Sequence, residues 1–234
     1  MNTLSQVLSR FEPISLEQMD NVRLMDRTDT KFVFRIEQLP FFLEQVSNDY
    51  RVLEVTSARI SRYETLYFDT EDFQLYLKHQ NGKLNRYKIR FRKYVESGLN
   101  FFEIKFKNNK GRTIKERIRR NDIEYNLEGE IRRLINEKTP LDPRLLIPRL
   151  WVNYSRITLV NKISRERLTI DINLNFKNNT SNKNFNSIVI AEIKQEKSSP
   201  SPFLKIMKQH HIREGSISKY CLGVISLYER VKKK

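Results

Sequence analysis

Cysteine is nearly absent from this sequence, because Cys221 is the only one in 234 residues. A single cysteine excludes an internal disulfide, and one cysteine with three histidines argues against a zinc site of the His and Cys type. We therefore expect a protein that functions in a reducing compartment.

Long apolar runs are also missing. No stretch approaches the ~20 consecutive apolar residues that a transmembrane helix needs, and residues 1–11 lack the apolar core of a signal peptide. We therefore expect a soluble, cytoplasmic protein without a transmembrane segment.

Negative charge is the third shortage. The 28 Asp and Glu residues are outnumbered by 44 Lys and Arg residues, which gives a formal net charge of +16. Such an excess favours an anionic partner, namely nucleic acid, a membrane surface or a phosphorylated small molecule. The apolar fraction of 38%, with 14 Phe and 10 Tyr, is large enough for a packed core. We expect one folded domain over residues 1–234.

The clearest pattern lies in residues 85–118, where cations alternate with apolar residues in three consecutive segments. Side chains alternate between the two faces of a strand, so the charges share one face and the apolar residues share the other. Gly98 and residues 108–111 supply turns, which predicts an antiparallel meander. The cations of its charged face are Arg86, Lys88, Arg90, Arg92, Lys105, Lys107, Lys115 and Arg117.

This charged face has an energetic consequence. Two like charges 4 Å apart repel by roughly 4 kcal/mol at an effective dielectric constant near 20. A sheet face with eight cations is therefore poorly stable unless open water or a polyanion neutralises it.

The remaining chain alternates between strand and helix patterns. Residues 173–187 are rich in Asn and predict a long exposed loop. Together the patterns predict an α+β fold, an eight-stranded antiparallel β-barrel with helices packed outside it, whose apolar faces meet the helices. The other predicted strands are 29–34, 51–55, 60–68, 150–160, 164–172 and 187–196, and the predicted helices are 36–48, 122–138, 199–209 and 216–230, the last capped by Ser216 or Ser218.

The charged strand faces carry the chemistry. Arg binds phosphate oxygens through two nitrogens and Lys acts as a point charge, so a mixture of both suits an extended polyphosphate. A few carboxylates in a basic site suit a divalent cation that bridges phosphates. The cations are Lys31, Arg90, Arg92, Lys105, Lys107, Lys115, Arg156 and Arg167, and the carboxylates are Glu103, Asp171, Glu192 and Glu196.

Two other interpretations of these residues stay open. Basic residues at alternate strand positions are typical of a solvated sheet face, and Glu192 could serve only as a salt-bridge partner of Lys194. A nucleic-acid surface could use tyrosines such as Tyr63 and Tyr67 for stacking. Because carboxylates share the basic faces and would repel a nucleic-acid backbone, we expect no nucleic-acid partner.

Nine short motifs resemble, in their order, the polyphosphate polymerase domain of the vacuolar transporter chaperone (VTC) complex, which is part of the triphosphate tunnel metalloenzyme (CYTH-like) superfamily. Each motif is weak alone, whereas their combination is specific. The motifs are Thr28–Phe34, Tyr67–Thr70, Lys88–Tyr94, Phe102–Lys107, Thr113–Arg117, Tyr154–Arg156, Arg167–Asp171, Ala191–Lys194 and Ser216–Tyr220.

The resemblance implies an enzyme that transfers the γ-phosphate of ATP onto a growing polyphosphate chain, with pyrophosphate and polyphosphate as further ligands and Mn²⁺ or Mg²⁺ as the cofactor. It implies Glu192 as the metal ligand, with Glu103 as a second candidate. A tunnel triphosphatase and a non-catalytic polyanion-binding or RNA-binding barrel are the alternatives. The residues that it places at the triphosphate and the product chain are Lys31, Arg90, Arg92, Lys105, Lys115, Arg156, Arg167 and Lys219, with Tyr154 close by and Lys107 on the same charged face.

Overall fold

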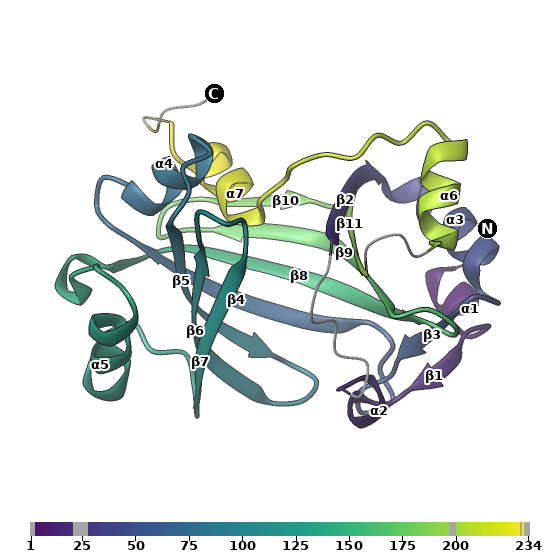
Figure 1. Cartoon of the computed structure of the whole chain (residues 1–234), viewed down its shortest axis with the longest axis horizontal. Coiled ribbons are helices and arrows are strands. Elements are labelled where there is room, and N and C mark those ends of the chain that lie inside the picture. Colours follow the sequence, from purple (N-terminus) through teal and green to yellow (C-terminus); the bar gives the residue numbers. More distant parts are fainter. Residues whose placement is uncertain (1–2, 21–27, 197–199, 230, 232–234) are drawn as a thin grey trace. The chain divides into compact units, whose positions relative to one another are not determined.

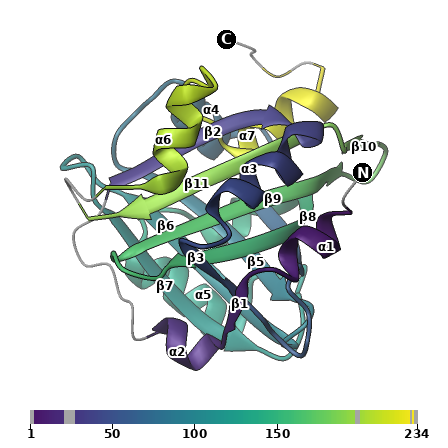
Figure 2. The ribbon, with the colours of Figure 1, turned by 90° about the vertical axis from the view of Figure 1, so that its right-hand side faces the viewer.

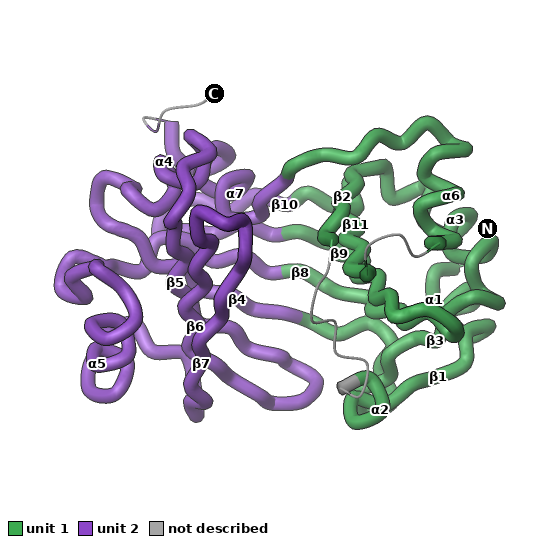
Figure 3. The backbone as a smooth tube through the Cα atoms, viewed as in Figure 1, with its two compact units in different colours: residues 1–62, 154–174, 185–216 green, residues 63–153, 175–184, 217–234 purple. Residues whose placement is uncertain are grey.

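The computed structural model describes residues 3–20, 28–196, 200–229 and 231, and the chain divides into two compact units (Figure 3). Unit 1 consists of Met1–Arg62, Tyr154–Leu174 and Phe185–Ser216, and unit 2 consists of Tyr63–Asn153, Asn175–Asn184 and Ile217–Lys234. The single domain over residues 1–234 stays a prediction.

The sheet of unit 1 is built on antiparallel neighbours in the order β2-β11-β9-β8 (Figure 2). Strand β3 pairs with β8 in antiparallel fashion, and β1 pairs with β3 in parallel. The strands are β1 (Glu12–Ile14), β2 (Thr28–Arg35), β3 (Tyr50–Leu53), β8 (Ile147–Asn161), β9 (Glu166–Lys177) and β11 (Ile188–Gln195), of which β8 and β9 also contribute residues to unit 2.

Helices cover the apolar face of this sheet. Figure 2 shows α1 (Leu4–Leu8), α3 (Leu39–Val46) and α6 (Pro202–Gln209) lying over its strands. Phe32 and Phe34 of β2 share one buried cluster with apolar residues of these helices. Burial of apolar surface at about 25 cal/mol per Å² makes this cluster the main source of stability in unit 1. The short elements α2 (Leu16–Asp20) and η1 (Ile36–Gln38) complete the unit.

A buried carboxyl group also lies in unit 1. Glu166 is fully buried and its Oε1 accepts a hydrogen bond from the Tyr50 hydroxyl, which accepts in turn from the Phe203 backbone N at 3.4 Å. Glu166 and Gln195 are direct partners across β9 and β11, and both side chains are buried. Burial raises the pKa of Glu166.

We expect Glu166→Gln to gain stability relative to the wild type as pH rises from 5 to 8. A carboxyl group with a raised folded-state pKa contributes stability that is present below its unfolded pKa and is lost as pH rises through the folded pKa. The amide cannot ionise, so the variant avoids that loss. Urea unfolding at each pH measures the difference, with the exposed Glu37→Gln of the same unit as the matched control. Parallel pH profiles for Glu166→Gln and the wild type would contradict this expectation.

Unit 2 contains the predicted meander. The meander consists of β5 (Arg86–Tyr94), β6 (Leu99–Lys107) and β7 (Thr113–Arg120), and β4 (Ser61–Asp69) lies beside β5. The four strands are consecutive antiparallel neighbours. Gly98 and Gly111 in the two turns have positive φ angles of 65° and 75°, which only glycine adopts readily. The prediction of three strands with one charged face is confirmed, and β7 extends to Arg120.

The apolar face of the meander packs against helix α5 (Gly129–Lys138), which lies beside it in Figure 1. Ile131 and Ile135 of the helix are buried with apolar residues of β5 and β6. The predicted start of this helix at residue 122 is wrong. Gly129 has a φ of +57°, so the helix begins there and the preceding residues 121–128 are bent and irregular.

The prediction of a long exposed loop over residues 173–187 is also wrong. Strand β9 continues to Lys177, and β10 (Asn182–Phe185) pairs with it. The Asn175 amide donates hydrogen bonds to Asn182 Oδ1 at 2.5 Å and to Asn184 Oδ1 at 2.7 Å. Asparagine, which is typical of loops, here connects two strands through its side chains.

Two more helices complete unit 2, α4 (Gln74–Gln80) and α7 (Lys219–Leu227), with the short turn η2 (Pro143–Leu145). Ser218 caps α7 by accepting a hydrogen bond from the Cys221 backbone N at 3.4 Å, which confirms one of the two predicted caps. A Cβ atom on Gly223 would lie 2.6 Å from Leu150 and 2.7 Å from Phe176. The close packing of α7 on β8 and β9 therefore requires glycine at position 223.

The predicted α+β class with a large antiparallel sheet and helices packed on it is confirmed. Of the helices in residues 3–20, 28–196 and 200–229, none combines the length and the apolar character that crossing a membrane requires.

Candidate functional site

Unit 2 holds a cluster of paired charges around a buried carboxylate, the Glu103 cluster, made of Tyr67, Arg90, Glu103 and Lys115. Arg90 and Glu103 are direct partners across β5 and β6, so Arg90 Nε and Nη2 reach Glu103 Oε2 at 2.8 and 2.6 Å. Lys115 of β7 pairs with the other carboxylate oxygen. Arg90 Nη1 also donates to the Tyr67 hydroxyl at 2.9 Å. The register of the four strands β4, β5, β6 and β7 therefore fixes the cluster.

The electrostatic effect of these cations is large. Burial alone would raise the pKa of Glu103, but the charges of Arg90, Arg92 and Lys115 hold it well below its usual range. Burial would likewise raise the pKa of Tyr67, yet the charges of Arg90, Arg92 and Lys88 lower it to about 8. Glu103 is therefore ionised at neutral pH, and it compensates part of the positive charge.

Three lysines stand in one row across the same face. Lys88 of β5 is the direct partner of Lys105 of β6, which is the direct partner of Lys115 of β7. Directly opposed like charges destabilise a sheet. Lys115 is paired with Glu103, and Lys88 Nζ lies 2.9 Å from Ser218 Oγ, at the start of α7. The row is therefore suited to an anion that contacts several ammonium groups.

Two arginines of the meander lie on aromatic rings. The Arg92 guanidinium carbon is 5.8 Å from the centre of the Tyr63 ring, and Arg92 Nε donates to Thr65 Oγ1 at 3.4 Å. The Arg117 guanidinium carbon is 4.5 Å from the centre of the Phe101 ring. Stacking on a ring orients a guanidinium while its outer nitrogens can still bind an anion.

Helix α7, which begins with Lys219, is anchored by a buried hydrogen bond. The Tyr220 hydroxyl donates to Asp69 Oδ2 at 2.6 Å. Asp69 also accepts from the backbone N atoms of Leu75 and Tyr76, at 2.8 and 2.9 Å, in the first turn of α4. The rings of Tyr67 and Tyr220 stack with centroids 4.7 Å apart. Asp69 thus connects β4, α4 and α7 close to the Glu103 cluster.

We expect Tyr220→Phe to lower the free energy of unfolding by about 2 kcal/mol, because a buried hydrogen bond to a carboxylate contributes roughly 1.5–3 kcal/mol. Chemical denaturation measures the change. Tyr125→Phe is the control, since Tyr125 lies in the same unit with 58% of its surface exposed. Equal stabilities of the two variants would show that the Asp69 contact contributes nothing.

Unit 1 holds a second set of charges, the Glu192 cluster, made of Asp29, Lys31, Glu192 and Lys194. Glu192 Oε1 lies 3.4 Å from Lys31 Nζ, and Glu192 Oε2 lies 2.5 Å from Lys194 Nζ. Lys194 Nζ is also 3.5 Å from Asp29 Oδ2. Burial would raise the pKa of Glu192, but the charges of Lys194 and Lys31 hold it well below its usual range.

Two arginines lie beside this cluster in unit 1. Arg156 donates from Nε and Nη2 to the two oxygens of Asp171, at 2.6 and 2.8 Å, and its guanidinium carbon is 5.2 Å from the centre of the Tyr154 ring. Arg167 is the direct partner of Lys194 across β9 and β11. These cations of unit 1 therefore lie on four neighbouring strands, β2, β11, β9 and β8.

A divalent metal fits one of the two predicted carboxylates better than the other. The described residues contain no group of three His, Cys, Asp or Glu side chains that could hold a metal ion. Mg²⁺ is commonly bound by one or two carboxylates together with substrate phosphates. The Glu192 side chain is 21% exposed and could act in this way, whereas the Glu103 side chain is fully buried among its cations.

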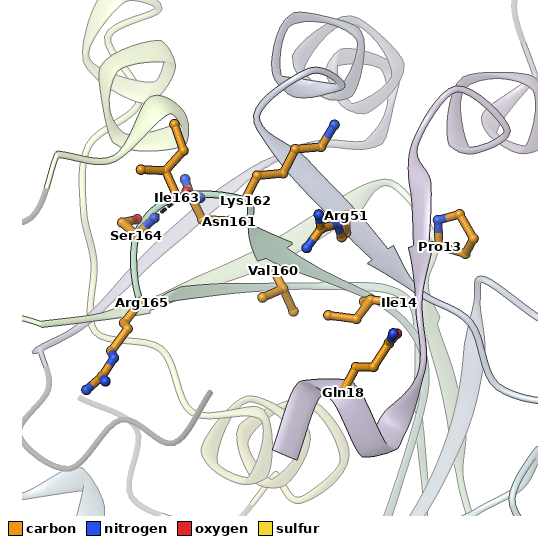
Figure 4. A pocket seen from close by; sticks show the side chains of 10 residues that line it. All are labelled: Pro13, Ile14, Gln18, Arg51, Val160, Asn161, Lys162, Ile163, Ser164 and Arg165. Carbon is orange, nitrogen blue, oxygen red and sulfur yellow. Dashed lines mark hydrogen bonds between the residues drawn. The ribbon is translucent and has the colours of Figure 1, made fainter. Parts of the chain in front are cut away.

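Unit 1 also contains a pocket of about 530 Å³, and its lining residues do not include any member of the two charge clusters. Figure 4 shows the ten side chains that line it, among them Ile14, Arg51 and Val160. Its Arg51 and Lys162 are both paired with Glu12. None of the predicted site residues lines this pocket, so it is no part of the candidate site.

The structure thus brings the predicted residues into two groups, while their roles stay predictions. Lys88 and Lys194 were not predicted as site residues, although the alternation of charged and apolar residues places both on the charged faces. Unit 2 holds Arg90, Arg92, Glu103, Lys105, Lys107, Lys115 and Lys219, and unit 1 holds Lys31, Tyr154, Arg156, Arg167 and Glu192.

Solved structures share this fold. A candidate adenylate cyclase from Bacillus halodurans is similar with a TM-score of 0.54 and 15% identity, over 88% of this chain and 100% of that chain. A candidate adenylyl cyclase from Hippeastrum, described as having a dominant triphosphatase activity, is similar with a TM-score of 0.54 and 12% identity, over 85% of this chain and 96% of that chain.

Sequence comparison gives a more specific result. No curated protein matches the sequence. The family profile described as VTC domain matches residues 26–228, which include both charge clusters. The chain therefore belongs to the VTC domain family.

Proposed function

We propose that this protein is a metal-dependent polyphosphate polymerase that transfers the γ-phosphate of ATP onto a growing inorganic polyphosphate chain. The observation that supports this most is the row of Lys88, Lys105 and Lys115, three directly opposed cations on one sheet face, in a chain of the VTC domain family. A linear chain of phosphates is an anion of the right shape for such a row.

The proposed reaction needs no nucleophilic side chain. A terminal phosphate oxygen of the acceptor attacks the γ-phosphorus of ATP, the bond from that phosphorus to the β,γ-bridging oxygen breaks, and ADP leaves with the electron pair. Phosphoryl transfer of this kind depends on positioning and charge neutralisation. Glu192 would hold Mn²⁺ or Mg²⁺, which would supply positive charge that neutralises part of the charge on the phosphates.

The contacts of the predicted cations suggest different roles for them. Arg90 directs its guanidinium nitrogens at Glu103 and Tyr67, so it orients the Glu103 cluster. Arg156 directs Nε and Nη2 at Asp171, which orients its guanidinium group. The cations that would contact phosphates are Arg92, Lys105, Lys107, Lys115 and Lys219 in unit 2 and Lys31, Arg156 and Arg167 in unit 1, with Tyr154 beneath Arg156.

A tunnel-type triphosphatase is the second proposal. It is favoured by the triphosphatase activity described for the Hippeastrum protein, which shares the fold at 12% identity. The same cationic faces could bind tripolyphosphate, with water in place of a phosphate acceptor. For either activity we propose one domain over residues 1–234. We also propose a cytoplasmic location, which the single cysteine supports.

The two activities differ in their products. The pure protein is incubated with ATP, Mn²⁺ and pyrophosphate, and ADP release and polymer length are followed on a gel. Chains that lengthen as ADP appears support the polymerase. Orthophosphate from tripolyphosphate without chain growth supports the triphosphatase, and tight polyphosphate binding without any turnover would leave only a polyanion-binding protein.

A further inference from the structure

The position of Lys194 suggests how metal binding is controlled. Its ammonium group lies between two carboxylates, 2.5 Å from Glu192 Oε2 and 3.5 Å from Asp29 Oδ2. Glu192 is two residues away on β11 and shares its face, while Asp29 is the direct partner of Lys194 across β2 and β11. Only 12% of the Lys194 side chain is exposed, so its ammonium group is confined to this neighbourhood.

Both oxygens of Glu192 are engaged by ammonium groups, Oε1 by Lys31 and Oε2 by Lys194. A divalent cation and an ammonium group compete for the same carboxylate oxygen, because the two positive charges repel each other at short distance. Of the two lysines, Lys194 is the closer to Glu192, and it also forms an ion pair with a second carboxylate, Asp29.

We propose that Lys194 is a positioning residue that regulates metal binding at Glu192. Its ammonium group holds Glu192 when no divalent cation is bound and moves to Asp29 when one binds. Asp29 keeps the displaced charge paired, so the exchange avoids leaving a largely buried ammonium group without a counterion. This inference rests on the proposed function, because it takes Glu192 as the metal ligand.

The exchange predicts opposite effects for the two neighbours of Glu192. Without the charge of Lys194 the metal meets no competitor, so Lys194→Gln should bind Mn²⁺ roughly tenfold more tightly. Without Asp29 the ammonium group has no second partner and stays on Glu192, so Asp29→Asn should bind Mn²⁺ several-fold more weakly. In the Lys194→Gln background, Asp29→Asn should have no further effect.

Titration of the full-length protein with MnCl₂ alone, followed by electron paramagnetic resonance of free Mn²⁺, tests this without nucleotide or turnover. Lys162→Gln is the charge-matched control, because Lys162 lies in unit 1 and is paired with Glu12. Circular dichroism shows which variants fold. If Lys194→Gln does not fold, Lys194→Arg serves in its place and should bind Mn²⁺ with the affinity of the wild type. Asp29→Asn should still lower the affinity for Mn²⁺.

The outcomes separate the inference from the proposed function. A Lys194→Gln variant that binds Mn²⁺ no more tightly than the wild type overturns the role of Lys194, and so does an Asp29→Asn effect that is equal in both backgrounds. If Glu192→Gln binds Mn²⁺ like the wild type, the metal ligand is wrong and the inference fails with it. Chain growth from ATP is measured independently and decides the polymerase activity by itself.

Discussion

Arg92→Met is expected to reduce kcat/KM for ATP-dependent chain growth roughly 100- to 1,000-fold, the usual effect of removing one preorganised charge contact to a transition state. Arg92 is the arginine of β5 that lies on the Tyr63 ring and is partly exposed, whereas Arg90 is 8% exposed and bound to Glu103. Methionine keeps much of the apolar stem of arginine and loses only the guanidinium group. The loss should therefore appear in catalysis far more than in folding.

The control for this variant is Arg144→Met. Arg144 lies in unit 2, has a side chain that is 77% exposed and is paired with Asp142, so its replacement changes the net charge of the same unit equally. We expect the activity of this variant to stay within about twofold of the wild type, because an exposed charge acts weakly at long range in salt. Equal activity losses in the two variants would mean that only net charge matters and that Arg92 contacts no phosphate.

The meander was predictable because its alternation is strict. Between Arg86 and Arg92 every second residue is a cation and the others are apolar, and one register satisfies both faces at once. A shift of one residue would place Ile89 and Phe91 on the charged face and Arg90 in the apolar core. The sequence therefore determines the strands, their faces and their pairing together.

The errors have local causes that composition does not show. The helix predicted from residue 122 begins at Gly129, because that residue adopts a left-handed backbone conformation. The loop predicted over residues 173–187 is a strand pair, because Asn175 bonds to two asparagines of the opposite strand. At Gly129 the residue type that signals a break does end the helical pattern, whereas in residues 173–187 side-chain hydrogen bonds override it.

Within the candidate site, the sequence predicts which charges share a face but not which are already paired. Tyr220 and Asp69 are 151 positions apart, and no local pattern connects them. Arg90 is bound to Glu103, whereas Arg92 lies on an aromatic ring. This difference likewise depends on how deeply each side chain is buried in the folded unit. Pairing is a three-dimensional property, so assigning individual roles requires the structure.

Glu103→Gln is expected to lower the free energy of unfolding by roughly 3–5 kcal/mol, because it removes one partner of a buried ion pair and leaves the others uncompensated. The variant keeps the shape of the side chain and removes its charge, while Arg90 and Lys115 keep theirs. Urea denaturation at neutral pH measures the loss. Glu116→Gln is the matched control, since Glu116 lies on the adjacent strand β7 and is only half-buried.

The same variant separates a structural carboxylate from a metal ligand. As a counterion, Glu103 repels phosphates, so Glu103→Gln should bind tripolyphosphate more tightly although it is less stable, and its Mn²⁺ affinity should not change. Because the folded-state pKa of Glu103 is depressed, its contribution is present above the unfolded pKa near 4.5 and is lost as pH falls through the folded value. The stability difference should therefore be constant at neutral pH and shrink in acid. Loss of Mn²⁺ binding would instead identify Glu103 as a ligand.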